Sequence, residues 1–188
     1  MYRYNPYVKE LIQKIKNGEL GEIISVEAQM NCYHTAVNRQ WLEAFPGGIM
    51  FFLGCHLVDL ILQIKGKPER IIPLHRCTGL DGVTAQDFGM AVFVYKNGIS
   101  IAKVNAAEVG GFASRQLVVS GSKQTVELKP LEMYTSGGLY TGMTEYHSED
   151  WKDMGTAKDS NVYNRYDSMM AAFAAMVRGG CENPYTYD

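Results

Sequence analysis

The chain has 188 residues, of which 46% are hydrophobic and 20% charged, and its formal net charge is −2 at pH 7. This length and composition predict one soluble globular domain, residues 1–188, with a full hydrophobic core and no membrane-spanning segment. The lysine and arginine residues are scattered rather than clustered, which disfavours nucleic acid or an anionic membrane as a partner because either needs a basic stripe.

The first predicted elements are a helix and a strand. Asn5 is a suitable N-cap, and Pro6 falls at the first helical position, where its missing N–H costs nothing. Apolar residues then recur at helical spacing until Asn17-Gly18 ends the run. From Ile24 to Met30 apolar and polar residues alternate, which predicts a strand with one buried face.

The strongest apolar stretch runs from Ile49 to Ile64, after Gly47-Gly48. Its length predicts a helix, and its apolar residues on all sides predict burial. Strands are expected next. Phe88–Tyr95 is apolar on both alternating sets of residues, so both of its faces are expected to be covered. Asn97-Gly98 then predicts a hairpin into the strand Ile99–Ala106.

The rest of the chain contains one more hairpin and one more helix. Gly121-Ser122 separates two predicted strands, Gln116–Ser120 and Thr125–Leu128. Residues 133–160 are rich in glycine, tyrosine and acidic groups, which predicts a long loop with one short strand at most. An apolar stripe between Val162 and Val177 predicts the last helix.

This order of elements predicts an α+β fold with a largely antiparallel open sheet and helices on one face. Because three helices cannot easily cover both faces, the second apolar face of the strand at 88–95 predicts a homodimer formed through the sheet. Cys32, Cys55, Cys77 and Cys181 form no CxxC pair, so neither a zinc site nor a redox motif is expected. Cys32 and Cys55 are expected to be buried free thiols, which favours a cytoplasmic location.

His56 is the most informative single residue. On a helix it shares one face with Phe52 and Asp59, and an imidazole with a carboxylate one turn away can act as a general acid or base near neutral pH. A buried histidine bonded to a backbone carbonyl is the alternative interpretation. Cys55 is excluded as its partner, because neighbours on a helix point about 100° apart.

The chain has no motif for binding a nucleotide. A dinucleotide-binding fold needs a GxGxxG turn between a strand and a helix, and a phosphate-binding loop needs its own glycine pattern. Gly110-Gly111 and Gly137-Gly138 have neither the spacing nor the context. No cofactor is therefore expected to bind to this chain alone.

The segment from Gly47 to Asp59 resembles the signature of the glucose–fructose oxidoreductase/inositol dehydrogenase (Gfo/Idh/MocA) family, in which a glycine pair is followed by aspartate, glycine, histidine and a second aspartate. Three other segments resemble further parts of the same family: Arg3-Tyr4-Asn5-Pro6, the turn Gly18–Ile23 and the hairpin Ser120–Leu128. The matches follow one another in the family's order, so the resemblance covers nearly the whole chain.

The resemblance implies a substrate-binding C-terminal domain, with an N-terminal Rossmann domain that holds NAD or NADP and is absent from this chain. It implies that His56 accepts a proton from a sugar, cyclitol or related polyol while hydride leaves for the nicotinamide. Phe52 stands where the family has an aspartate, which removes the carboxylate usually beside the histidine. The alternative function is therefore a non-catalytic relative that serves as a sheet-mediated dimerisation or ligand-binding module.

Four more residues are expected to line the same substrate pocket as Phe52. Asn31, Tyr33 and His34 follow the first strand, where its end should face the cofactor cleft. Trp41 precedes the glycine pair and is a candidate hydrophobic wall or stacking surface for a sugar. For each of them the alternative is an exposed loop residue or a core aromatic.

Overall fold

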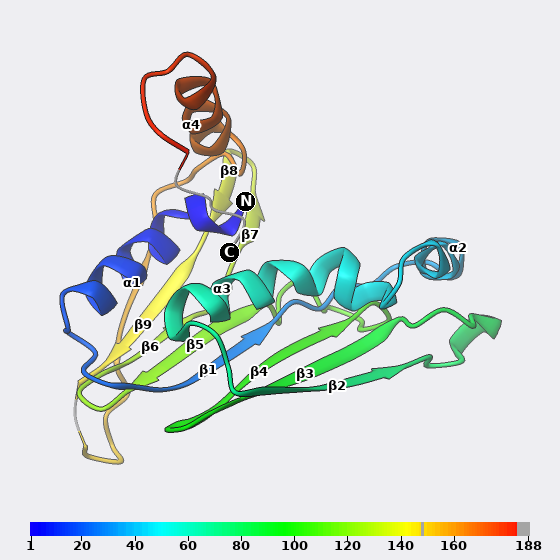
Figure 1. Cartoon of the computed structure of the whole chain (residues 1–188), viewed down its shortest axis with the longest axis horizontal. Coiled ribbons are helices and arrows are strands. Elements are labelled where there is room, and N and C mark those ends of the chain that lie inside the picture. The colour runs from blue at the N-terminus through cyan, green and yellow to red at the C-terminus, as the bar shows by residue number, and fades with distance from the viewer. Residues whose placement is uncertain (148, 184–188) are drawn as a thin grey trace.

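The computed structural model describes residues 1–147 and 149–183 (Figure 1). Its helical segments are η1 (Tyr2–Tyr4), α1 (Pro6–Lys16), α2 (Ala36–Gln40), η2 (Trp41–Ala44), the π-helical turn η3 (Met50–Gly54), α3 (Cys55–Lys65), η4 (Leu80–Gly82) and α4 (Asp167–Val177). Its strands are β1 (Ile23–Gln29), β2 (Arg70–Arg76), β3 (Phe88–Tyr95), β4 (Gly98–Asn105), β5 (Gln116–Gly121), β6 (Thr125–Leu128), β7 (Met133–Thr135), β8 (Gly138–Tyr140), β9 (Gly142–Tyr146) and β10 (Thr156–Asp159).

Eight of these strands form one sheet in the order β10-β9-β6-β5-β1-β4-β3-β2, and β7 pairs with β8 alone. β1 runs parallel to β4, whereas the other neighbouring strands are antiparallel. Helices α1 and α3 lie on the same face of this sheet (Figure 1). The predicted α+β fold, a largely antiparallel open sheet with helices on one face, is confirmed. The one parallel pair brings the end of β1 beside the end of β4.

Helix α1 begins as its sequence predicts. The Asn5 side chain accepts hydrogen bonds from the backbone N–H groups of Tyr7 and Val8 at 2.9 and 3.1 Å, and Pro6 occupies the first turn. The amide nitrogen of Asn5 also donates to Thr141 Oγ1 at 2.7 Å. The Asn5 side chain therefore caps the helix and also links it to the segment around Thr141.

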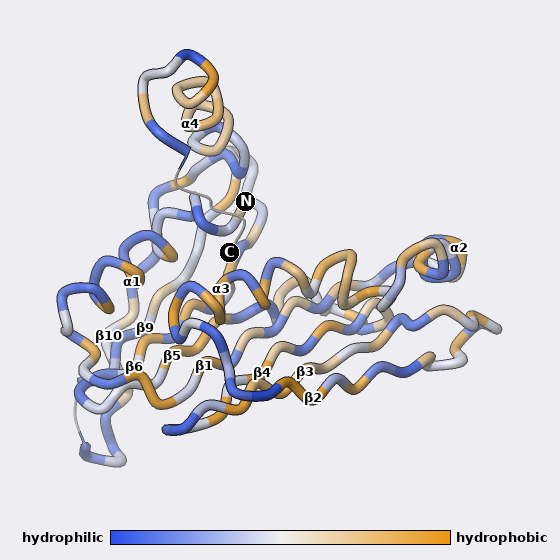
Figure 2. Tube along the Cα trace, viewed as in Figure 1, coloured by the Kyte–Doolittle hydropathy of each residue, from blue (hydrophilic) through white to orange (hydrophobic). Residues whose placement is uncertain are grey.

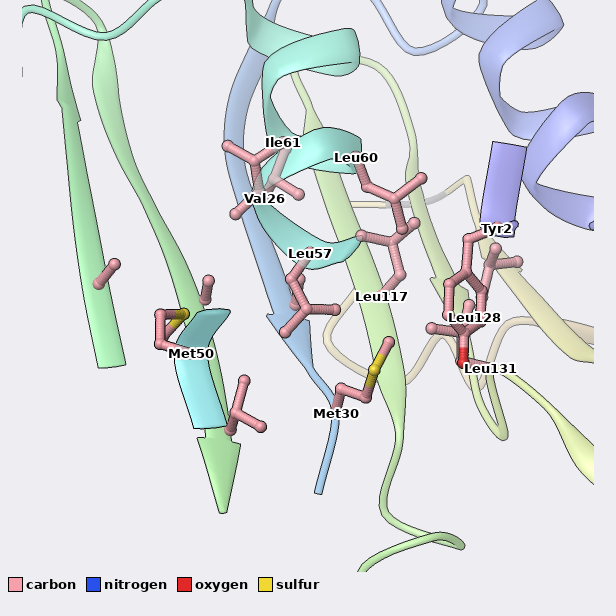
Figure 3. Packing of buried hydrophobic residues seen from close by; sticks show 14 of the residues in the cluster. Tyr2, Val26, Met30, Met50, Leu57, Leu60, Ile61, Leu117, Leu128 and Leu131 are labelled. Carbon is pink, nitrogen blue, oxygen red and sulfur yellow. The ribbon is translucent and has the colours of Figure 1, made fainter. Parts of the chain in front are cut away.

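The core lies between the sheet and helix α3. Leu57, Leu60 and Ile61 of α3 are fully buried and face the sheet, where Val26 of β1 and Leu117 of β5 are fully buried as well (Figure 3). Each large apolar side chain buried in this way contributes about 1.5–3 kcal/mol to folding. This packing fixes which side of α3 points at the sheet and which side is left for other contacts.

The opposite face of the sheet has no described helix on it (Figure 1). Along β3 fully buried residues such as Ala91 and Phe93 alternate with half-buried ones such as Val92. Within the described residues of this chain only one face of the strand is covered, and the expected cover of the other face by a second subunit stays a prediction. Both sets are apolar, and only the set that faces α3 is closed off from solvent.

The apolar stretch at 49–64 is not one buried helix. Residues Met50–Gly54 form a π-helical turn before α3 begins, and the side chains of Phe51 and Phe52 are exposed. Cys32 is a buried free thiol as expected, but Cys55 is exposed, which corrects that expectation. The physical reason is the same for these residues: an element lying on a sheet buries one side, whatever the polarity of the other.

Four short strands, β7 to β10, lie where the sequence predicts a loop at 133–160. The strand β2 was not predicted either. Strands of three to five residues have too little local periodicity to be recognised, and here they are stabilised by distant partners, as in the pairing of Leu128 with Met143. The hairpins at 97–98 and 121–122 are confirmed.

The last helix, α4, begins at Asp167 rather than Val162, because Tyr163 pairs through its backbone with Leu139. Its apolar stripe is present but lacks a fully buried residue, and Phe173 is 58% exposed. The helix projects away from the sheet, and its trace is mostly on the hydrophobic side of the scale (Figure 2). Among the helices of the described residues, none is long and apolar enough to cross a membrane.

Candidate functional site

A glycine pair leads the chain into the helix that carries His56. Gly47 and Gly48 have φ angles of 85° and 52°, a region that favours glycine. A Cβ at Gly48 would lie 2.2 Å from the backbone oxygen of Gln86, so a side chain cannot be accommodated there. The N–H of Ile49 donates to the same Gln86 oxygen at 2.9 Å. This close approach fixes where η3 and α3 begin over the sheet.

His56 is half-buried on the flank of α3 that faces the N-terminal turn η1. The ring of Tyr2 lies 5.7 Å from the imidazole, centroid to centroid, in an edge-on arrangement with an interplanar angle of 62°. Burial lowers the pKa of His56, and the amino group of Met1 lowers it further, whereas Asp59 and Glu132 act in the opposite direction. An imidazole with a lowered pKa is neutral near pH 7 and can accept a proton.

Asp59, one turn along α3, is held by other groups. Arg3 Nε donates to its two carboxylate oxygens at 3.1 and 2.9 Å, and the Arg3 guanidinium forms an ion pair with it. Gln63 Nε2 donates to the same carboxylate at 2.9 Å. The carboxylate that shares a helix face with His56 therefore anchors η1 to α3.

The Tyr2 hydroxyl belongs to a group of polar and charged side chains that the sequence analysis did not identify. This group, which we call the Glu132 cluster, consists of Tyr2, Arg115, Glu132 and Arg165. The Glu132 carboxylate, only 1% exposed, accepts hydrogen bonds from Tyr2 Oη, from Arg115 Nη1 at 2.6 Å and from Arg165 Nε at 3.0 Å. Arg115 Nε also donates to the backbone oxygen of Asn31 at 3.1 Å. The cluster thus joins the chain start, the end of β1 and the segments that follow β4, β6 and β10.

The three candidate residues after β1 have different surroundings. Asn31 is fully buried, and its amide nitrogen donates to Glu108 Oε2 at 2.6 Å. Tyr33 is exposed, and His34 is half-buried, with its pKa lowered by burial and then by the positive charge of Arg115. Asn31 and His34 therefore lie beside Arg115, on the same side of the molecule as the Glu132 cluster, while the Tyr33 side chain faces solvent.

Trp41 and Phe52 belong to a second group, an aromatic cluster in which they and Phe51 are exposed and Phe45 is half-buried. The Trp41 and Phe52 rings lie 5.3 Å apart in an edge-on arrangement, and Phe45 stacks against Phe52 at 5.8 Å. The structure therefore places the predicted site residues in two groups: ring contacts join Trp41 to Phe52, whereas His56 is in ring contact with Tyr2.

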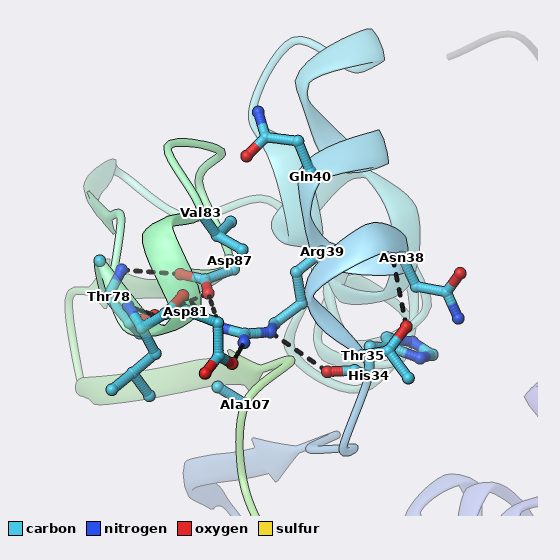
Figure 4. Close-up of polar contacts among 12 residues, drawn as sticks. His34, Thr35, Asn38, Arg39, Gln40, Thr78, Asp81, Val83, Asp87 and Ala107 are labelled. Carbon is cyan, nitrogen blue, oxygen red and sulfur yellow. Dashed lines mark hydrogen bonds and ion pairs between the residues drawn. The ribbon is translucent and has the colours of Figure 1, made fainter.

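A buried arginine holds the end of β1 and helix α2 in place (Figure 4). Arg39, 1% exposed, forms ion pairs with Asp81 and, at 3.0 Å, with Asp87. Its Nε donates to the backbone oxygen of His34 at 3.1 Å, and Asp87 accepts from the N–H and hydroxyl of Thr78. The buried Arg39 side chain, which is paired with both aspartates, therefore holds the backbone at His34 next to the turn that carries Trp41.

The two glycine pairs that the sequence analysis compared with a nucleotide-binding turn both lie outside helix starts. Gly110-Gly111 lies in a turn after β4, and Gly137-Gly138 lies where β7 turns into β8, so neither pair joins a strand to a helix. A cavity of about 620 Å³ lies between the N-terminal turn and α4, lined by apolar residues such as Met169 and Phe173 together with the Arg3–Asp59 pair. This cavity adjoins the helix turn after His56.

Residues 8–127 match the GFO/IDH/MocA C-terminal domain family. A search of curated proteins finds no match. Among solved structures the chain is similar to an oxidoreductase from Thermotoga maritima, with a TM-score of 0.69 and 15% identity over 97% of this chain and 52% of that one.

Two further solved structures were determined with bound nucleotide. The first is a levoglucosan dehydrogenase in complex with NADH and levoglucosan, with a TM-score of 0.65 and 13% identity over 86% of this chain and 45% of that one. The second is an inositol dehydrogenase homologue complexed with NAD⁺ from Azotobacter vinelandii, with a TM-score of 0.65 and 14% identity over 85% of this chain and 42% of that one. At these identities the likeness concerns the fold, and the chain spans about half the length of each.

Proposed function

This chain belongs to the GFO/IDH/MocA C-terminal domain family, and from that premise we propose that it is the substrate-binding domain of an NAD(P)-dependent oxidoreductase acting on a sugar, cyclitol or related polyol. The observation that carries the proposal is the half-buried imidazole of His56, which follows the glycine pair and has a lowered pKa. In its neutral form this imidazole accepts the proton of a substrate hydroxyl.

In this proposal the nicotinamide cofactor is bound by a domain other than residues 1–188. The chain spans about half the length of solved relatives, and neither Gly110-Gly111 nor Gly137-Gly138 joins a strand to a helix. The nicotinamide, bound by a Rossmann domain, supplies the hydride acceptor. The nucleotide-bound levoglucosan and inositol dehydrogenase structures support a nicotinamide cofactor and a polyol substrate.

The proposal also includes a homodimer formed through the open face of the sheet. Ile72, Leu74 and Ile99 project from that face and are 37%, 45% and 52% exposed, and Val92 and Ile101 lie between them. A continuous apolar surface on a sheet is stabilised when a second copy covers it. The cytoplasmic location stays a prediction.

The second candidate is a non-catalytic relative, and the aromatic cluster favours it. Phe52 replaces a carboxylate one turn before His56, and with Trp41 and Phe51 it makes the surface there apolar rather than polar. Such a surface suits a ligand or protein partner with an apolar side. In this case the domain binds without supplying a proton acceptor.

The deciding experiment replaces His56 in the protein that joins this domain to a nucleotide-binding domain. His56→Ala should lower turnover of a polyol substrate about 10²–10⁴-fold, because a positioned base contributes about that much, while the Kd for NAD(P) stays the same. The exposed His147 provides the control, and His147→Ala should leave turnover unchanged. Unchanged turnover in His56→Ala would eliminate the catalytic role, and a wild-type protein that is inactive on a panel of polyols would favour the second candidate.

A further inference from the structure

The Glu132 cluster contains a buried carboxylate that is surrounded by hydrogen-bond donors. Glu132 is almost fully buried, and Arg115, only 8% exposed, pairs with it at 2.6 Å. A carboxylate removed from water carries a large desolvation penalty unless several donors surround it. Tyr2 Oη and the guanidinium groups of Arg115 and Arg165 supply those donors. The Tyr2 hydroxyl is therefore bound to a carboxylate that two arginines hold in place.

The other end of Tyr2 meets His56. Its ring lies edge-on to the imidazole at 5.7 Å, while its hydroxyl is held by Glu132. Tyr2 is 4% exposed, so it has little freedom to turn. Fixing the tyrosine ring therefore limits the orientations open to the imidazole. Position 52, one turn before His56, carries a phenyl ring that contacts Trp41 and provides no carboxylate for this purpose.

The charges around His56 come from each element that packs near it. The Met1 amino group comes from the chain start, and Asp59 comes from α3 itself. Arg3 and Asp59 pair with each other. The remaining charged groups are Arg115 and Glu132, on the segments before β5 and after β6.

We propose that Tyr2 and Glu132 are positioning residues for His56: the buried carboxylate holds the tyrosine hydroxyl, and the tyrosine ring holds the imidazole in the orientation that faces substrate. In this proposal Tyr2 and Glu132 together orient the imidazole, a role that a carboxylate at position 52 could otherwise fill. The inference rests on the proposed function for its catalytic meaning, but its test needs no turnover.

The test is an NMR titration of the histidine ring signals in this 188-residue chain, in which His75 and His147 serve as internal references. Tyr2→Ala removes the ring that shields the imidazole, so the pKa of His56 should rise toward its usual value of about 6.5. Glu132→Gln keeps an acceptor for the hydroxyl but removes the anion and leaves the arginines unneutralised, so the pKa of His56 should fall below its wild-type value. General loosening of the fold would raise it in both variants.

Tyr2→Phe separates the ring from its anchor and leaves every ion pair of the cluster intact, so it remains informative if Glu132→Gln does not fold. The pKa of His56 should rise part of the way toward the Tyr2→Ala value. Tyr146→Phe is the matched control, because Tyr146 Oη also donates to a glutamate, Glu127, at 3.3 Å, far along the sheet on β9.

Two results support the proposal together: opposite shifts in Tyr2→Ala and Glu132→Gln, and an intermediate shift in Tyr2→Phe. A Tyr2→Phe value equal to wild type overturns it, because the ring alone would then suffice. A rise in Glu132→Gln, or a shift in Tyr146→Phe as large as that in Tyr2→Phe, overturns it as well. Loss of the catalytic role alone, with these shifts present, would instead reject the proposed function and leave the positioning pair standing.

Discussion

The two faces of the main sheet are built from the same strands and from similarly apolar residues, yet they meet different surroundings. On the face under α3, Val26, Ala102 and Leu117 are fully buried. On the open face, Ile72 and Leu74 are more than a third exposed. The contrast is clearest within the single strand β4, where Ala102 on the α3 side is fully buried and Ile99 on the open side is 52% exposed. Residue type alone therefore does not decide which face becomes the core. The helix packed on one face decides it and leaves the other as a candidate contact surface.

The largest expected effect comes from weakening the covered face. Leu57→Ala removes a fully buried side chain from the middle of α3 and should reduce the free energy of unfolding by about 3 kcal/mol, since the lost burial adds to the cavity left behind. Leu62→Ala is the matched control on the same helix, because Leu62 is 39% exposed, and its effect should stay below about 1 kcal/mol. Urea unfolding followed by circular dichroism measures both, and equal effects would contradict the division into a core face and an outer side of α3.

A substitution on the open face should change the stability of the domain less but should change its oligomeric state. Ile72→Lys should convert the proposed dimer into a monomer, because a lysine in the middle of the interface would have to lose its water. Its neighbour Ile71 pairs with Phe93 and so points to the opposite, α3 side of the sheet, where it is 48% exposed at the sheet edge. Ile71→Lys therefore provides a control on the same strand and should leave the dimer intact. Light scattering with size-exclusion chromatography gives the mass of each, and a monomeric wild type would refute the interface.

The smallest expected effect is the pH dependence of stability that His56 causes. The pKa of His56 is lowered in the folded state, chiefly by burial, so below about pH 6.5 the unfolded chain binds a proton more readily than the folded one. Stability should therefore fall as the pH drops through 6.5, and His56→Gln should lose less stability than wild type between about pH 7.5 and 5.5. Urea unfolding at the two pH values measures this, and a larger loss in His56→Gln would reverse the assigned direction.

The candidate site could be predicted from the sequence only where its residues are neighbours along the chain. The glycine pair and His56 lie within ten positions of each other, and their pattern on one helix is visible in the sequence. Glu132 lies 130 residues from Tyr2, its hydrogen-bond partner, and neither stands in a recognisable motif. Glu132 stands between Leu131 and Met133, and this local pattern does not identify its partners.

The sequence by itself determined the elements whose signals are local: the cap at Asn5, the hairpins, the alternation along β1 and the helical run that carries His56. Tertiary structure decided which face of the sheet is covered, why Cys55 and Phe52 are exposed in an apolar run, and how short strands such as β9 find partners. The physical reason is distance along the chain. Periodicity and capping act over a few residues, whereas burial and the pairing of Glu132 depend on surfaces that meet only once the chain has folded.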